Sequence, residues 1–185
     1  MDEYIDIVTS DGKATGEKVL KSVAHKRGLY HNTIHLWLYT KNREILLQQR
    51  SHKKKIHPLL WDVSVAGHID AGETFIEAAI RETEEEIGLN LQPNTLHKIG
   101  VQLHESSYDN GKVLDNEFHQ VYIAELNARL EDLTPQPEEV EALKFVTFEE
   151  FTELLKNSQT NSHFIATNKS YYLFVLNGIK EALSK

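Results

Sequence analysis

The sequence predicts an α/β fold in which a mixed β-sheet is flanked by helices. Two observations predict it: apolar, β-branched runs typical of strands recur along the chain, and three other segments carry apolar residues at helical spacing. Because these segments alternate irregularly, a mixed sheet is favoured. The 185 residues show no internal repeat or long linker, so we expect a single domain over residues 1–185.

Each strand is predicted from a short run of apolar and β-branched residues. The runs cover about residues 4–9, 33–40, 44–49, 96–104, 117–126 and 142–146. The pairs Asp11-Gly12 and Asn110-Gly111 lie between strand-like segments and are typical of hairpin turns. Helical periodicity predicts helices at about residues 74–87, 148–157 and 168–184.

The composition excludes several classes of protein. With 20 basic and 28 acidic residues the formal net charge is −8, which argues against binding of a nucleic acid polymer. A hydrophobic content of 40% excludes a disordered chain, and the absence of cysteine excludes a disulfide scaffold. No apolar run approaches the ~20 residues of a membrane span, and the start lacks a signal-peptide pattern. We therefore expect no membrane partner and a cytoplasmic location.

The predicted helix at residues 74–87 carries an acidic face. Its apolar stripe, which is expected to face the core, consists of Ile76, Ile80, Thr83 and Ile87. Glu82, Glu85 and Glu86 share a neighbouring face and repel one another without a counter-charge. A hard divalent cation reverses this repulsion, and oxygen ligands suit Mg²⁺ or Mn²⁺. Arg81 stands one turn before Glu85 and is placed to hold its carboxylate. Taken alone, the acids also fit a solvated helix face.

A wider pattern surrounds these acids. Gly67, Glu73, Arg81, Glu82, Glu85, Glu86, Gly88 and Leu89 match Gly-x5-Glu-x7-Arg-Glu-U-x-Glu-Glu-x-Gly-U, where U is a bulky aliphatic residue. This pattern over residues 67–89 resembles the signature of the Nudix hydrolase family, with one departure at Thr83, the first U position. The resemblance implies an α/β/α sandwich that holds Mg²⁺ on Glu82, Glu85 and Glu86. It also implies hydrolysis of a diphosphate linkage in a nucleoside diphosphate derivative or another small diphosphate.

The motif residues receive distinct expected roles. Arg81 orients the acids, and Glu85 or Glu86 is a candidate to accept the proton of the attacking water. Glu73 is expected to support the loop or an outer metal. Gly67 and Gly88 are expected to provide backbone freedom at the two ends of the motif.

A second resemblance extends outside this motif, over about residues 2–146, and is looser. It rests on these residues in order: His25, Leu29-Tyr30-His31, Leu47 to Ser51, Lys55, Pro58, Trp61, Ala66-Gly67-His68 and Asp115-Asn116-Glu117. This succession is similar to the isopentenyl-diphosphate isomerase branch of the same superfamily. In that branch the residues matching His25, His31, His68, Asp115 and Glu117 form a metal site, which implies a second metal site here. Such a donor set suits Mn²⁺, Zn²⁺ or Fe²⁺ better than Mg²⁺.

The critical departure from the isomerases is at Ala66. They place a catalytic cysteine there, and a methyl group cannot transfer a proton. Glu117 matches the glutamate of the isomerase acid–base pair and remains a candidate ligand or base. We therefore predict an isomerase-like scaffold that performs hydrolysis.

Basic residues before the motif are candidates for phosphate binding. Arg50 is favoured because its guanidinium can hold a phosphate bidentately, and Lys55 is the next candidate. Glu138 or Glu139 in the acidic loop is another candidate base, and loops 106–113 and 133–140 are expected to set specificity. The aromatic closing helix suggests core packing or a homodimer contact.

Two alternatives to the hydrolase remain open at the level of sequence. One is an isomerase of prenyl diphosphates, which lacks its thiol at Ala66. The other is a non-catalytic module that binds a nucleotide or diphosphate, although a pure binder has little need for three clustered carboxylates.

Overall fold

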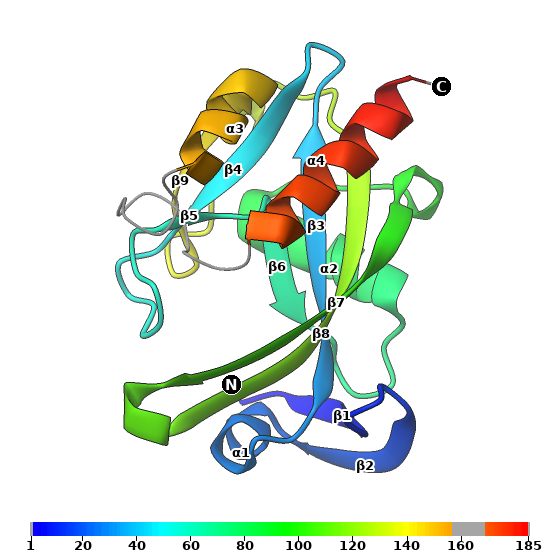
Figure 1. The fold of residues 1–185 in the computed structure, drawn as a ribbon, viewed down its shortest axis with the longest axis vertical. Helices are drawn as coiled ribbons and strands as arrows, with labels where there is room; N and C mark the ends of the chain where they lie inside the picture. The colour runs from blue at the N-terminus through cyan, green and yellow to red at the C-terminus, as the bar shows by residue number, and fades with distance from the viewer. Residues whose placement is uncertain (1, 157–168, 185) are drawn as a thin grey trace.

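The computed structural model describes residues 2–156 and 169–184 (Figure 1). Its strands are β1 (Tyr4–Val8), β2 (Ala14–Leu20), β3 (His31–Tyr39), β4 (Glu44–Arg50), β5 (Trp61–Asp62), β6 (Val65–His68), β7 (His97–Tyr108), β8 (Val113–Glu125) and β9 (Val140–Thr147). Its α-helices are α1 (Lys21–Arg27), α2 (Phe75–Ile87), α3 (Phe148–Lys156) and α4 (Lys169–Leu183). Short 3₁₀ turns occupy Pro93–Thr95, Asp109–Gly111 and Leu130–Asp132.

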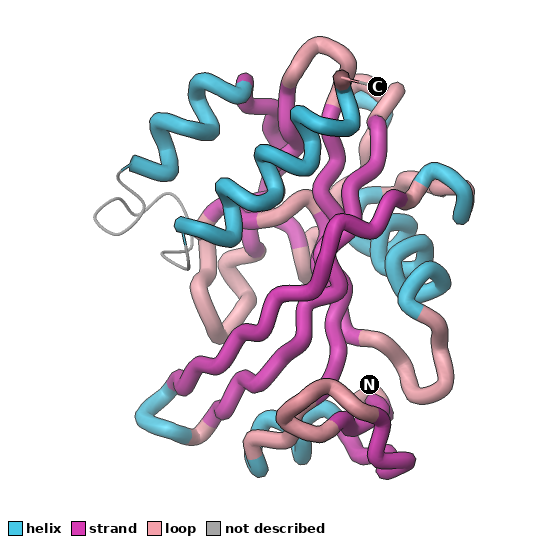
Figure 2. The backbone as a smooth tube through the Cα atoms, turned by 45° about the vertical axis from the view of Figure 1, so that its right-hand side comes forward, coloured by secondary structure: helices cyan, strands magenta, loops and turns pink. Residues whose placement is uncertain are grey.

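Strand β3 is the centre of the sheet. It runs parallel to β8 and antiparallel to β1, β4 and β6. Strand β7 pairs with β8 as a long hairpin that projects from the body of the molecule (Figure 2). Strands β5 and β9 both pair with β4. A parallel pair among antiparallel pairs makes the sheet mixed, as predicted.

Helices cover both faces of this sheet. Side chains of β3 alternate between the faces, as a pleated strand requires. Trp37 and Tyr39 join the core cluster that includes α3 and α4, whereas Leu36 and Leu38 join the cluster beneath α2. Figure 1 shows α4 in front of the sheet and α2 behind it. The expected α/β/α sandwich is confirmed.

The predicted strands and helices are all present, and several boundaries differ. The β7–β8 hairpin is longer than predicted, because β7 continues to Tyr108 and β8 begins at Val113. Four elements were not predicted: β2, α1, β5 and β6. Both turn signals lie between paired strands, at the β1–β2 and β7–β8 connections. The expected helix ends at Asn157 and Asn168 lie outside the described residues.

The closing helix α4 is a packing element. Tyr171, Tyr172, Val175 and Ile179 are buried in the core cluster of this chain. Leu173 and Phe174 of the same helix are exposed, so the expected homodimer contact stays a prediction. None of the described helices combines the length and the apolar character needed to cross a bilayer.

Candidate functional site

Helix α2 is fixed at both ends by its own sequence. The Thr74 hydroxyl accepts from the Glu77 N–H at 3.3 Å, and the Glu77 carboxylate accepts from the Thr74 N–H at 2.9 Å. Gly88 ends the helix with a φ of 68°, the left-handed conformation expected of it. The predicted stripe faces the core, with Thr83 and Ile87 fully buried.

Arg81 organises the acidic side of α2. Its Nε and Nη2 atoms donate to Glu73 at 2.9 and 2.8 Å. Its Nη1 donates to Glu82 at 2.9 Å and to Glu85 at 3.3 Å. The hydrogen bond to Glu73 raises the pKa of Arg81 further above its ordinary value, with added support from Glu82. Because Nη2 also donates to the carbonyl of His68 at 3.0 Å, Arg81 ties the acids to strand β6.

Gly67 has a different role from the one expected. Its φ is not among the positive values, so its place does not depend on backbone freedom. A Cβ added at Gly67 would lie 2.0 Å from Cδ and 2.2 Å from Oε1 of Glu82. Gly67 therefore leaves the space that the Glu82 carboxylate occupies against β6, and the expectation of backbone freedom holds only for Gly88.

Two of the three acids are buried at a cost. Burial raises the pKa of Glu82 to about 7, although Arg81 acts in the opposite direction. Burial, followed by the charge of Glu82, raises the pKa of Glu86 to about 8. Glu85 is different, because 60% of its side chain is exposed. Desolvated carboxylates of this kind are stabilised in their charged form by a nearby cation.

The acids open into a cavity of about 350 Å³. Glu82, Glu85 and Glu86, which we call the acidic site, line it together with Lys21 and Lys54. A hard divalent cation fits this arrangement, because carboxylate oxygens and a water-accessible space lie on one side of α2. The two lysines supply positive charge in the same cavity wall.

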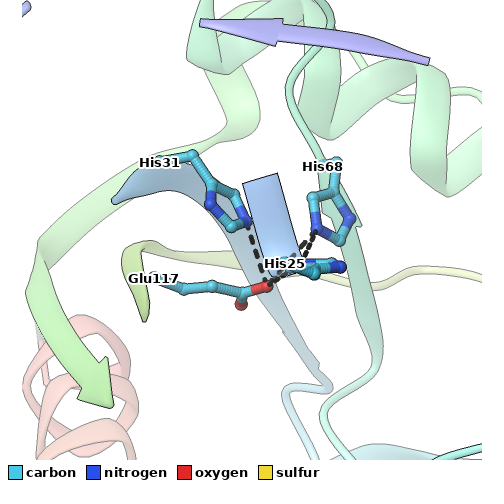
Figure 3. A group of neighbouring side chains, drawn as sticks. All are labelled: His25, His31, His68 and Glu117. Carbon is cyan, nitrogen blue, oxygen red and sulfur yellow. Dashed lines mark hydrogen bonds and ion pairs between the residues drawn. The ribbon is translucent and has the colours of Figure 1, made fainter. Parts of the chain in front are cut away.

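A second constellation lies on the other side of β6. His25 comes from α1, His31 from the start of β3, His68 from the end of β6 and Glu117 from β8. We call these four residues the histidine site; their ligand atoms all lie within 4.8 Å of one another. Figure 3 shows the three imidazoles around the Glu117 carboxylate. Glu117 Oε1 lies 3.7, 3.4 and 3.3 Å from the Nε2 atoms of His25, His31 and His68, respectively.

The hydrogen bonding of His31 indicates why these groups converge. Its Nδ1 lies 2.9 Å from the carbonyl of Leu29, which only accepts, so Nδ1 carries a hydrogen. In the neutral ring, Nε2 is then a bare lone pair that faces the Glu117 carboxylate. This Nε2 is the buried side-chain atom without a hydrogen-bond partner among the described residues. A metal cation satisfies both facing lone pairs, so the donor set fits a metal.

Asp115 lies beside the histidine site but outside its convergent donors. Its Oδ1 is 3.4 Å from His25 Nε2. Burial and the neighbouring Glu117 raise the pKa of Asp115. Burial alone would raise the pKa of Glu117 too, but interactions with the three surrounding histidines hold it well below its usual range.

The two sites face adjoining cavities. The main cavity, also about 350 Å³, contains His25, His68, Asp115 and Glu117 in its lining. The two cavities share Lys21, Lys54, Ala66, Gly67 and His68 in their walls. A ligand that extends past strand β6 from one cavity into the other therefore contacts both the acidic and the histidine site.

The structure changes the set of candidate phosphate-binding residues. Arg50 lines the main cavity, as expected, and donates to the carbonyl of Ile56. Lys55 is exposed and is absent from the lining of both cavities, whereas its neighbour Lys54 lines both. Lys21 also lines both cavities and was missed, because α1 was not predicted. The one feature that could have drawn attention to Lys21 is its position, as a basic residue directly after the exposed strand β2.

The loops contribute as follows. Of the segment 106–113, which was expected to be a loop, residues 106–108 belong to β7, and Tyr108 at its end lines the main cavity; Gln136 and Glu139 of the loop 133–140 line the second. Glu139 is paired with Lys54, and Glu138 is paired with Lys53. Of the two candidate bases in this loop, Glu139 is therefore the one at a cavity wall.

Comparison with known proteins agrees with this geometry. The model of the NUDIX domain matches residues 29–167. Nudix hydrolase 3 of Arabidopsis thaliana is 40% identical over 157 residues, which cover 83% of this chain but only 20% of the plant protein. The isopentenyl-diphosphate Delta-isomerase of Cutibacterium acnes is 27% identical and covers 84% of this chain and 79% of its own.

A solved structure shows the same fold. A Deinococcus radiodurans protein superposes with a TM-score of 0.66 at 20% identity, covering 94% of this chain and 98% of its own. Nudix enzymes usually use divalent metals, and the histidine site is a cluster that could hold one. The domain match over most of the chain and the 40% identity to a Nudix hydrolase show that this chain belongs to the Nudix family.

Proposed function

We propose that residues 1–185 act as one Mg²⁺-dependent hydrolase domain that cleaves the diphosphate linkage of a small molecule. The supporting observation is the acidic site, which opens into a cavity that is also lined by Lys21 and Lys54. A diphosphate needs cationic partners on several oxygens, and both the lysines and a metal on the acids supply them.

The acids have separate roles in this proposal. Glu82, Glu85 and Glu86 would hold the metal, Mg²⁺ or alternatively Mn²⁺, which would supply charge to polarise the diphosphate and lower the pKa of water. Arg81 and Glu73 position these acids through the hydrogen bonds described above. Gly67 keeps the space for Glu82.

The reaction requires one proton acceptor. Water attacks a phosphorus atom, the bridging P–O bond breaks, and the leaving phosphate oxygen carries away the electron pair. Glu86 is one candidate base, because its buried carboxylate lines the cavity beside the other acids. Glu85, Glu117 and, from the loop 133–140, Glu139 are the other candidates.

We further propose that the histidine site holds a second divalent metal of the Mn²⁺, Zn²⁺ or Fe²⁺ class. The partnerless Nε2 of His31 supports this assignment. Asp115 supports the site from the side through His25. Arg50 and Lys54 add positive charge to the same cavity, next to the position that a phosphate takes.

A panel of diphosphates tests the proposal. Wild type is expected to release phosphate or a nucleoside monophosphate with Mg²⁺ or Mn²⁺, and Glu86→Gln is expected to lose at least 100-fold in kcat, a typical scale for loss of a positioned proton acceptor or a ligand. Glu84→Gln is the matched control, because Glu84 lies on the exposed face of the same helix. Equal turnover by wild type and Glu86→Gln contradicts the role of Glu86.

Isomerisation of a prenyl diphosphate is the competing function. It is favoured by the likeness to an isopentenyl-diphosphate isomerase and by the histidine site. It is disfavoured by Ala66, because its side chain has no proton to exchange. Conversion of isopentenyl diphosphate to its dimethylallyl isomer by wild type would decide for this function.

A further inference from the structure

A second group of imidazoles lines the main cavity beyond Glu117. Glu117 Oε1 faces the histidine site, whereas its Oε2 lies 3.4 Å from Nδ1 of His119. The ring of His119 stacks on His35 with centroids 3.9 Å apart and an angle of 17° between planes. His104 lies on the other side of His119, at 5.5 Å. We call His35, His104 and His119 the imidazole stack; all three line the cavity.

Buried neighbours fix the position of the proton on His35. The indole Nε1 of Trp37 only donates, and it donates to the Tyr171 hydroxyl at 2.9 Å. The same hydroxyl lies 2.7 Å from Nδ1 of His35, the acceptor available to it among the described residues. Tyr171 therefore donates to Nδ1. Burial lowers the pKa of His35 well below its ordinary value, so the neutral ring carries its hydrogen on Nε2.

The Nε2–H of His35 is free to bind a ligand. It has no hydrogen-bond partner in the part of the chain that the structure describes. Among the described residues, the one side-chain nitrogen or oxygen that is both fully buried and without a partner is Nε2 of His31. Nε2 of His35, which also has no partner, is therefore reachable by solvent. His35 lies directly opposite Ala66 in the β3–β6 register, so the two side chains share a face of the sheet. Since alanine ends at Cβ, the space beside the ring is left to a ligand.

The wall of the cavity that contains His35 carries polar groups beside apolar side chains such as Ile56 and Leu103. Asp62 lines the same cavity with 17% of its side chain exposed, and Gln102 and Tyr108 lie in the wall. His119 contacts Thr33 and Glu117 through Nδ1, at 2.7 and 3.4 Å, which leaves its second ring nitrogen for another partner. A ligand here meets hydrogen-bonding atoms on several sides.

We propose that the imidazole stack and Asp62 form a specificity subsite for a polar organic group that presents a hydrogen-bond acceptor to His35. The sugar or base of a nucleoside has this chemistry, and a prenyl chain does not. This inference rests on the proposed function, since it concerns the group attached to the diphosphate. The imidazole stack lines the main cavity, whereas the acidic site lines the adjoining one, so the polar group and the diphosphate occupy neighbouring cavities that share part of their walls.

The discrimination follows from desolvation. A hydrocarbon chain in this subsite removes water from the His35 N–H and offers no acceptor, which leaves a buried donor unpaired. Sites built to hydrogen-bond a substrate reject analogues that lack the partner more strongly than apolar pockets reject an extra group. The subsite therefore selects against prenyl diphosphates even though the scaffold resembles that of the isomerases.

Substrate preference measures this selection. The probes are ADP-ribose and UDP-glucose as polar diphosphates, and isopentenyl diphosphate as the hydrocarbon one. For wild type we expect kcat/KM for at least one polar probe to exceed that for isopentenyl diphosphate by tenfold or more. Preference of wild type for isopentenyl diphosphate overturns the inference.

Variants of His35 show whether this residue carries the preference. His35→Leu is expected to lower kcat/KM for the preferred polar probe about 10- to 100-fold, mainly through KM, without lowering that for isopentenyl diphosphate. His35→Gln keeps an N–H donor and is expected to recover part of the kcat/KM lost in His35→Leu. If the leucine variant does not fold, the glutamine variant still tests the site. His97→Leu is the control, since His97 is exposed on β7 and absent from the cavity lining. Equal losses for both kinds of probe in His35→Leu contradict the inference.

A binding measurement separates this inference from the proposed function. No hydrolysis of any probe by wild type contradicts the function but leaves the subsite testable. Calorimetric titration of wild type and His35→Leu with ADP and with isopentenyl diphosphate then decides. The subsite is supported if His35→Leu binds ADP with a tenfold higher Kd than wild type and binds isopentenyl diphosphate with the same Kd. Unchanged Kd values for both ligands overturn it.

Discussion

At the scale of single residues, the absence of a side chain at Gly67 determines where Glu82 can lie. The Glu82 carboxylate fills the volume that a Cβ would take, so Gly67→Ala forces it away from β6 and from Arg81. The displaced group is the end of a long side chain, and we therefore expect the fold to survive. The Mg²⁺ concentration for half-maximal activity is expected to rise at least tenfold, as measured by metal titration of the rate.

A double-mutant cycle checks this route. If Gly67→Ala acts only through Glu82, then combining it with Glu82→Gln adds little to the loss from Glu82→Gln alone. Additive losses would show that Gly67 acts on the reaction in another way.

Residue identity predicted part of the acidic site and missed part of its surroundings. The spacing of Glu82, Glu85 and Glu86 was sufficient to place them together, because helical periodicity is local. The choice between Lys54 and Lys55 was not, because these residues lie in a loop whose path depends on contacts with Glu139. No local pattern encodes that contact.

At the scale of elements, α2 delivers all three acids, so its ends determine the rigidity of the site. The capping box of Thr74 and Glu77 satisfies N–H groups that the first turn leaves free. Thr74→Ala is expected to cost about 1 kcal/mol of unfolding free energy, measured by urea denaturation. Thr74→Ser retains the cap and serves as the control. An unchanged denaturation midpoint in Thr74→Ala would show that α2 is held by packing alone.

The elements that the sequence did not reveal are short or exposed. Helix α1 has seven residues, of which Ala24 alone is buried, so it lacks an amphipathic repeat. Strand β2 is mostly exposed, and β5 has two residues. Their conformation is imposed by neighbours, with β2 held by pairing to β1. Lys21 therefore went unrecognised, whereas His25 was found only through its resemblance to the isomerases.

At the scale of the whole molecule, the sheet brings together residues that are distant in sequence. The pairing of β3 with both β6 and β8 places His31, His68 and Glu117 side by side, and α1 adds His25. Sequence periodicity predicts strands but not which strands are neighbours, so this site depended on resemblance rather than on spacing. The acidic site, built on one helix, could be predicted from the residues themselves.

Because the histidine and acidic sites lie on opposite sides of β6, metal binding to each is expected to be separable. A ligand that binds only the folded state stabilises it by about 2.7 kcal/mol at a hundredfold excess over Kd, or roughly 5–10 °C in Tm for a chain of this size. For chelator-treated wild type we expect such a rise with Mn²⁺. His68→Ala removes one convergent donor and is expected to abolish most of the rise in Tm with Mn²⁺, whereas Glu85→Ala and the exposed control His97→Ala keep this rise.

Mg²⁺ prefers oxygen ligands, so the smaller rise in Tm with Mg²⁺ is expected to disappear in Glu85→Ala and persist in His68→Ala. Differential scanning fluorimetry measures both shifts, and a full Mn²⁺ response in His68→Ala would remove the histidine site from the proposal.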